Sequence, residues 1–275
     1  MAKSKFEYVR YFEQENKCLK NCWIVVRIDG KNFHRFTEIH EFDKPNDING
    51  LNLMSNAAVN VLREFSDINL AFGHSDEFSF VFKKKTNIFN RRSDKILSLV
   101  NSIFSSSFVF LWNKYFPNKQ LIYAPAFDAR IVLYPTDQNL RDYFSWRQAD
   151  VHVNNLYNTC FWALVLKMGL SPVEAEEKLR GTLSSAKNEL LYKNFDINYN
   201  NEPEIFRKGT VLVRKCISWE GATKPKSVII PLHCDIIKDD FWNSHPEILD
   251  QSETPLVDKL KLDHYFVCEQ KNFKM

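Results

Sequence analysis

Three acidic side chains have the type and spacing that phosphoryl chemistry requires. Asp29 ends a short apolar run, and Asp76 and Glu77 stand side by side further along the chain. Carboxylate oxygens are the ligands that Mg²⁺ prefers, and two such ions about 4 Å apart can clamp the attacking and leaving oxygens of a phosphoryl displacement. Gly30 would let the backbone approach a metal or a phosphate closely. Asp-Gly and Ser-Asp-Glu are also common in ordinary turns, so spacing alone leaves both interpretations open.

The elements around these acids favour the metal site. Runs of β-branched and aromatic residues predict four strands, at 23–29, 68–73, 77–82 and 127–134. Apolar residues at helical spacing predict two helices, at about 48–65 and 91–116. The order strand, helix, strand, strand, helix, strand is the split βαβ, ferredoxin-like pattern of polymerase-type palms. In that fold, adjacent strands carry Asp29, Asp76 and Glu77 to the same edge of the sheet.

Beyond residue 135 the pattern changes from strand to helix. Helical spacing predicts a long helix through Met168, a second after Ser171-Pro172 and a third at 184–195. In the long helix we expect His152, Asn155 and Thr159 on the polar side, opposite an apolar stripe of Val153, Leu156, Tyr157, Cys160, Phe161 and Leu164. The segments 209–217 and 226–230 then predict a short terminal strand pair. We therefore expect an α+β protein with a palm-like catalytic domain over residues 1–135 and a helical region over residues 136–275 packed on it.

Composition and charge limit the protein class. The 275 residues are 44% hydrophobic, which indicates a folded globule, and the net charge of +3 permits nucleic-acid binding without requiring it. No apolar run reaches the roughly 18 residues of a membrane span. The six cysteines include no C-x-x-C pair, and His233-Cys234 has no second pair to complete a zinc site. With no secretory signal evident, we expect reduced thiols in an intracellular, cytoplasmic protein, and a nuclear or mitochondrial pool stays open.

Four separated motifs resemble those of the tRNA-histidine guanylyltransferases. They are IDGKNFHRF at 28–36, GHSDEFSF at 73–80, SWRQADVHVNNLYN at 145–158 and PLHCDII at 231–237. The similarity extends from Lys3 to the HPEILD segment at 245–250, which is most of the chain. Four motifs in the same order argue against chance similarity.

The resemblance implies a 3′–5′ nucleotidyltransferase that adds a guanosine to the 5′ end of tRNA-His, at position −1. In such enzymes ATP first adenylylates the 5′-monophosphate. The 3′-hydroxyl of GTP then attacks this end and expels AMP, and pyrophosphate is finally removed. The resemblance further implies two Mg²⁺ ions per active site, ATP and GTP as substrates, tRNA-His as partner and a homo-oligomer, a tetramer.

The resemblance also implies roles for individual residues. The catalytic acids Asp29, Asp76 and Glu77 bind the metals together with the carbonyl of Gly30. The nucleotide-binding residues are Lys31, Asn32, Phe33, His34, Lys44, Asn46, Asp47 and Ser75. The second triphosphate or the tRNA 5′ end is bound by Arg27, Arg92, Lys95 and Arg130. The tRNA contacts are His152, Asn155, Lys187 and Asn198. Thr37 and Asp43 depart from the family pattern, which has alanine at these positions in a close relative.

Two other functions compete with this one. A template-directed 3′–5′ polymerase that repairs truncated tRNAs would need the same fold and metals, but the motif at 146–158 favours the tRNA-His enzyme. A non-catalytic RNA-binding protein with an inactive palm would not need the three acids, all of which are present.

Overall fold

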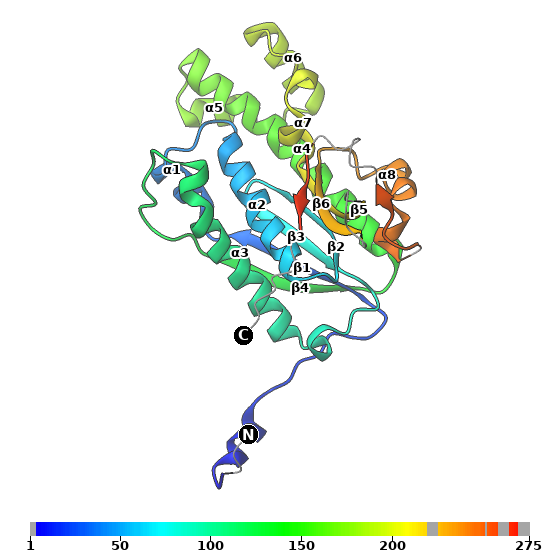
Figure 1. Cartoon of the computed structure of the whole chain (residues 1–275). Coiled ribbons are helices and arrows are strands. Elements are labelled where there is room, and N and C mark those ends of the chain that lie inside the picture. The colour runs from blue at the N-terminus through cyan, green and yellow to red at the C-terminus, as the bar shows by residue number, and fades with distance from the viewer. Residues whose placement is uncertain (1–3, 219–224, 251, 258–263, 269–275) are drawn as a thin grey trace.

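The protein is built around one antiparallel sheet with helices on both faces (Figure 1). The computed structural model describes the chain except for residues 1–3, 219–224, 251, 258–263 and 269–275. The strands are β1 (Trp23–Gly30), β2 (Ile68–His74), β3 (Glu77–Phe82), β4 (Phe127–Tyr134), β5 (Thr210–Ile217), β6 (Lys226–Leu232), β7 (Leu256–Val257) and β8 (Phe266–Val267). They lie in the order β4-β1-β3-β2-β5-β6-β8, and β7 pairs with β5 in parallel.

The four predicted N-terminal strands are confirmed. The predicted terminal strand pair is also present, but it belongs to the same sheet and is not a separate pair. β5 and β6 do pair with each other, but β5 also pairs with β2. The C-terminal part of the chain therefore continues the sheet that carries the acids, and the two parts share one hydrogen-bonded framework.

The helices form a layer on each face of the sheet. They are α1 (Phe33–Ile39), α2 (Ile48–Glu64), α3 (Ser93–Tyr115), α4 (Asp137–Met168), α5 (Pro172–Leu179), α6 (Ser184–Phe195), α7 (Glu204–Lys208) and α8 (Asp239–Ser244), with 3₁₀ turns η1 (Glu7–Phe12), η2 (Ile88–Arg91), η3 (Tyr199–Asn201) and η4 (Pro246–Leu249). Ile24, Val26 and Ile28 of β1 face α2 and α3, whereas Trp23 and Val25 face the N-terminal half of α4. Because β1 is buried on both faces, its sequence is a continuous apolar run.

Helix α3 packs on the sheet along one side only. Its inward residues Ile96, Val100, Phe104, Phe108 and Trp112 are buried in the core. By length and composition alone, this 23-residue helix contains an 18-residue window apolar enough to cross a membrane. Polar residues interrupt that window, so the sequence has no continuous apolar run of that length, and the buried face of α3 belongs to the protein core.

Helix α4 is the longest element, and its buried face differs from the predicted stripe. It begins where Thr136 accepts a hydrogen bond from the Asn139 N–H and ends at Gly169, whose φ of 74° is left-handed. Val153 was expected to face inward but is 56% exposed. Asn155 and Thr159 were expected on the polar side but are 2% and 5% exposed. Both polar side chains can be buried because they are hydrogen-bonded. The Asn155 amide has a partner at its oxygen and another at its nitrogen, and the Thr159 hydroxyl donates to the backbone carbonyl of Asn155. The hydrophobic pattern does not reveal these partners.

Candidate active site

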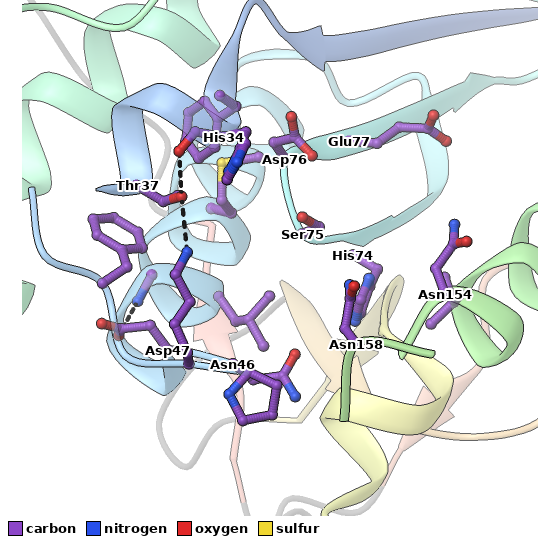
Figure 2. Close-up of a pocket in the computed structure, with 18 of the residues that line it drawn as sticks. His34, Thr37, Asn46, Asp47, His74, Ser75, Asp76, Glu77, Asn154 and Asn158 are labelled. Carbon is purple, nitrogen blue, oxygen red and sulfur yellow. Dashed lines mark hydrogen bonds between the residues drawn. The ribbon is translucent and has the colours of Figure 1, made fainter. Parts of the chain in front are cut away.

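The sheet brings the three acids to one edge. Asp29 of β1 lies opposite Glu77 of β3 in the antiparallel register. The turn between β2 and β3 is Ser75-Asp76, and Ser75 adopts a left-handed φ of 55° (Figure 2). The Gly30 N–H donates to the Asp76 carbonyl at 3.0 Å, which ties this turn to the end of β1. Strand register and turn geometry thus gather carboxylates that are 47 positions apart in the sequence.

Gly30 occupies a position that has no room for a side chain. A Cβ there would lie 2.6 Å from the Phe33 ring and 2.9 Å from the Asp76 Cβ. The glycine is therefore required by the close approach of the β2–β3 turn.

Burial and mutual repulsion dominate the electrostatics of the acids. Burial, reinforced by the negative charge of Asp29, raises the pKa of Asp76 to about 6. Burial also raises the pKa of Glu77, against the opposing effect of Arg147 and Arg27. A carboxylate such as Asp76, whose ionised form is disfavoured by burial and by a neighbouring carboxylate, is a donor that a divalent cation would stabilise. The residues present therefore fit a Mg²⁺ ion at Asp29 and Asp76.

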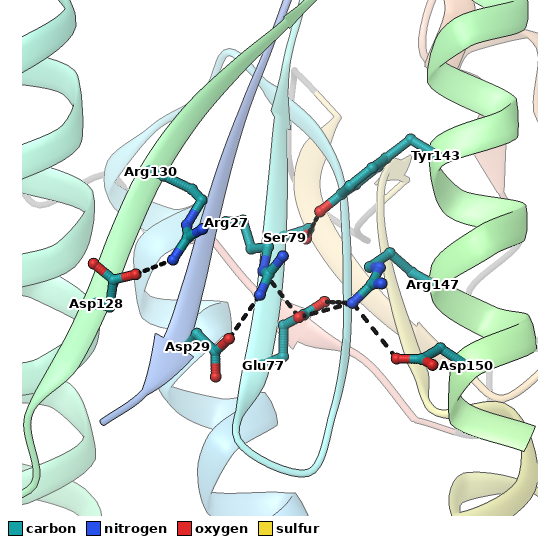
Figure 3. Close-up of polar contacts among 9 residues, drawn as sticks. All are labelled: Arg27, Asp29, Glu77, Ser79, Asp128, Arg130, Tyr143, Arg147 and Asp150. Carbon is teal, nitrogen blue, oxygen red and sulfur yellow. Dashed lines mark hydrogen bonds and ion pairs between the residues drawn. The ribbon is translucent and has the colours of Figure 1, made fainter. Parts of the chain in front are cut away.

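Glu77 faces a pair of arginines (Figure 3). Its carboxylate lies 2.9 Å from Nε of Arg27 and 3.1 Å from Nη1 of Arg147, and Nη2 of Arg27 also reaches Asp29 at 2.7 Å. Over the described ranges, no three Asp, Glu, His or Cys side chains are grouped so that they could hold a metal. The structure thus places the three acids at one edge of the sheet. Metal binding by Asp29, Gly30, Asp76 and Glu77 stays a prediction.

A cavity of about 630 Å³ opens beside the acids. Its near wall comes from β1, α1 and the segment before α2, and its far wall comes from α4 and α5 (Figure 2). Of the predicted nucleotide-binding residues, the cavity is lined by Phe33, His34, Lys44, Asn46, Asp47 and Ser75. Helix α4 contributes Asn154, Tyr157, Asn158, Phe161 and Trp162. The volume is sufficient for a nucleotide, since ligand sites commonly measure roughly 300–1,000 Å³.

Lys44 is held inside this cavity by a hydrogen bond to Thr37. The Lys44 Nζ donates to the Thr37 Oγ1 at 3.2 Å and lies 5.6 Å from the centre of the Trp162 ring. The Thr37 hydroxyl in turn donates to the His34 carbonyl at 2.9 Å. Burial lowers the pKa of Lys44. An ammonium group placed in this way is suited to bind a phosphate.

Other predicted nucleotide contacts have structural partners instead. The Lys31 N–H donates to the Ala126 carbonyl at 2.8 Å, so this backbone group is already paired within the chain. Asn32 has a left-handed φ of 53° and precedes α1. Neither Lys31 nor Asn32 lines the cavity. The Asp47 carboxylate accepts from the Gly50 N–H at 2.9 Å and thereby caps α2.

The four predicted basic contacts lie in two places within the described chain, and their binding of a common anion stays a prediction. Arg27 and Arg130 are directly opposite each other on β1 and β4, and Arg130 pairs with Asp128 (Figure 3). Arg92 and Lys95 are at the start of α3, which follows the end of β3 that lies away from the acids. Arg92 pairs there with Glu15 at 3.3 Å, and the Lys95 Nζ lies 4.6 Å from the centre of the Phe89 ring.

Two family models match consecutive parts of the chain. A model described as tRNAHis guanylyltransferase matches residues 6–135, and one described as Thg1 C terminal domain matches residues 138–238. The chain belongs to the tRNA(His) guanylyltransferase family. The family assignment made from the four motifs is confirmed.

Relatives in this family are similar over nearly their whole length. The chain is 54% identical over 267 residues to a probable tRNA(His) guanylyltransferase of Homo sapiens, covering 91% of this chain and 90% of that protein. It is 58% identical over 249 residues to the Drosophila melanogaster protein of the same description, covering 90% and 86%. The crystal structure of the Saccharomyces cerevisiae tRNA(His) guanylyltransferase matches with a TM-score of 0.74 at 52% identity, over 76% of this chain and 93% of that one. A bacterial tRNA(His) guanylyltransferase-like protein, at 21% identity and a TM-score of 0.70, shares the fold.

The residues predicted to contact tRNA differ in exposure and in hydrogen bonding. His152 is exposed on α4, and its ring lies edge-on to Tyr199 at 5.6 Å. The Lys187 Nζ donates to the Thr182 carbonyl at 2.7 Å, and Asn198 accepts from the Asn200 N–H at 3.1 Å. Asn155 is buried, and its amide has one hydrogen-bond partner at the oxygen and one at the nitrogen; its contact with RNA stays a prediction.

Arg147 was missing from the predicted site residues of this guanylyltransferase, although the sequence contains a signal for it. Arg147 lies inside the motif at 145–158, four residues before the buried Val151, so helical spacing places it on the inward face of α4. A charged residue on an inward face needs a partner, and Glu77 is that partner. No comparable signal identifies Thr37, because its bond to Lys44 depends on how the segment before α2 folds back.

Proposed function

We propose that this chain adds a guanosine to the 5′ end of tRNA-His, at position −1, by 3′–5′ nucleotidyl transfer. The observation that carries the proposal is an acidic sheet edge opening onto a nucleotide-sized cavity, in a chain more than half identical to relatives described as tRNA(His) guanylyltransferases. The reaction would begin with adenylylation of the 5′-monophosphate by ATP. The 3′-hydroxyl of GTP would then attack and release AMP, and pyrophosphate would be removed.

The acids would hold two Mg²⁺ ions per active site. Asp29, Asp76 and the Gly30 carbonyl would supply ligands, and Glu77 would join them by turning from its arginines. Such ions, when bound, neutralise phosphoryl oxygens and lower the pKa of an attacking hydroxyl. Lys44 and the backbone N–H groups of Phe33 and His34 would hold the nucleotide triphosphate.

The positive groups outside the cavity would bind the other substrate. Arg27 and Arg130 lie side by side on β1 and β4, and their adjacency supports binding of a second triphosphate or of the tRNA 5′ phosphate. His152, Lys187 and Asn198 of the helical part would contact the body of the tRNA.

The proposal extends to fold type and assembly. The strand order β4-β1-β3-β2, with α2 and α3 on one face, supports a ferredoxin-like, polymerase-type palm within residues 1–135. Residues 136–275 would be the tRNA-contacting region. We further propose a homotetramer in an intracellular setting.

A transfer assay tests this function. Full-length protein is incubated with 5′-monophosphorylated tRNA-His, ATP, Mg²⁺ and labelled GTP, and we expect label at the 5′ end of the tRNA. Asp76→Ala and Glu77→Ala should nearly abolish transfer while tRNA binding stays measurable. A tRNA with another anticodon and a 5′-truncated tRNA distinguish recognition of tRNA-His from templated repair. No labelled product with folded protein would refute the proposal.

A further inference from the structure

A chain of hydrogen bonds connects the cavity to the helical part of the protein. Asn46, which precedes α2 and lines the cavity, donates through Nδ2 to the Asn155 Oδ1 at 3.0 Å. Asn155, in the middle of α4, donates through its own Nδ2 to the Tyr199 hydroxyl at 3.0 Å. Each of these two hydrogen bonds joins residues that lie more than 40 positions apart in the sequence.

The inner members of this chain are buried and do not line the cavity. Asn155 is 2% exposed and Tyr199 is 3% exposed, and neither is among the lining residues. A buried amide without partners would cost free energy, and Asn155 has a partner for its oxygen and for its nitrogen. The cost of burying it is offset only while Asn46 and Tyr199 stay in place.

The bond from Asn155 fixes how Asn46 presents its amide. A primary amide has two N–H donors and one carbonyl acceptor. One N–H of Asn46 is directed at Asn155, so the carbonyl and the second N–H are left for a ligand. A side chain held in this way has lost its rotational freedom before the ligand arrives, which removes that entropic cost from binding.

We propose that Asn155 and Tyr199 are positioning residues that hold Asn46 in its nucleotide-binding orientation. The inference rests on the proposed function, in which Asn46 contacts a nucleotide. Tyr199 is the anchor of the relay, since its hydroxyl fixes the Asn155 amide from the side opposite the cavity. Sequence similarity alone would assign Asn155 to the tRNA surface, and its burial assigns it to the nucleotide site instead.

A double-mutant cycle tests the relay in the full-length protein. Tyr199→Phe removes one hydroxyl oxygen and keeps the buried ring, and it is compared with Asn46→Ala and with the double variant. The readouts are equilibrium binding of labelled GTP with Mg²⁺, the KM for GTP and kcat in the transfer assay, and the melting temperature. Tyr192→Phe is the matched control, because Tyr192 is 63% exposed on α6.

We expect Tyr199→Phe to weaken GTP binding and raise the KM about threefold to tenfold, with kcat changed less than about twofold, as expected for loss of one neutral hydrogen bond in binding. In the Asn46→Ala background it should have no further effect on GTP binding. Asn155→Leu, which breaks both bonds at similar volume, should reproduce the loss, and Tyr192→Phe should match the wild type.

Two results would overturn the relay. One is unchanged GTP binding in Tyr199→Phe. The other is that Tyr199→Phe weakens GTP binding equally in the wild-type and in the Asn46→Ala background. If Asn46→Ala binds GTP normally while guanylyl transfer to tRNA-His proceeds, the relay is wrong and the proposed function stands. Because GTP binding is measured without transfer, a failed transfer assay counts against the proposed function and leaves this test intact.

Discussion

Asp76 is expected to reduce the stability of the metal-free protein. Its pKa is raised from 3.8 to about 6 by burial and by the charge of Asp29. One pKa unit corresponds to about 1.4 kcal/mol, so the ionised carboxylate lowers the free energy of unfolding by up to about 3 kcal/mol. Asp76→Asn keeps the shape of the side chain and removes the charge. We expect this variant to be about 1–3 kcal/mol more stable than the wild type at pH 7.5 without Mg²⁺, and inactive in transfer.

The pH dependence of this difference identifies its cause. The folded state holds the Asp76 proton more tightly than the unfolded chain does, so the penalty is absent below about pH 4, grows between about pH 4 and 6 and is constant above about pH 6. Urea unfolding of both proteins from pH 4.5 to 7.5 measures this difference, since titrating groups far from Asp76 cancel in the comparison. Saturating Mg²⁺ should narrow the gap, because an ion bound only by the folded wild type stabilises it.

A matched control and a clear refutation are available. Asp128→Asn alters an acid of the same type that is exposed and paired with Arg130, and it should give no gain in stability. If Asp76→Asn is no more stable than the wild type at pH 7.5, or if the difference does not change with pH, the argument from burial and repulsion is wrong.

Three further predictions concern the neighbours of the acids. Thr37→Val should raise the nucleotide KM about threefold to tenfold by removing the acceptor of Lys44, whereas Thr37→Ser should retain wild-type kinetics. Arg147→Met leaves Glu77 with one arginine and should lower the free energy of unfolding, measured in urea, by about 1–3 kcal/mol. Arg147→Lys should partly recover this loss. Equal stability of Arg147→Met and the wild type would contradict the pairing. Gly30→Ala should cost about 1–3 kcal/mol in the same assay and abolish transfer, because its Cβ would overlap Phe33; an active, fully stable variant would refute the requirement for glycine.

Periodicity in the sequence predicted the elements that are buried continuously. The β-branched run that ends at Asp29 and the apolar spacing of α2 and α3 place these elements within about two residues, because burial on the sheet is what their pattern encodes. The seven-residue α1 was missed, since its sequence is polar and short and its two buried rings, Phe33 and Phe36, pack into a core that only the folded chain creates.

The parts of the site that the sequence did not predict depend on distant partners. Asn155 looks like a surface residue until Tyr199, 44 positions away, is known to bond it. Arg92 and Lys95 were grouped with Arg27 by resemblance, but chain topology places them at the other end of β3. The convergence of Asp29 with Asp76 and Glu77 could be predicted because strand order sets it, whereas roles that depend on individual side-chain partners from distant segments could not.

The charges at the acidic edge explain why the site needs cations when it works. The carboxylates of Asp29, Glu77 and Asp150 pair with the guanidinium groups of Arg27 and Arg147. With Asp76 beside them, four carboxylates face two guanidinium groups, which leaves two negative charges in excess when all four are ionised. A nucleotide triphosphate entering the adjacent cavity would add several more negative charges, which Lys44 alone cannot balance. Divalent ions at this edge would compensate the carboxylates and the phosphates together, so loading of metal and loading of nucleotide should strengthen each other.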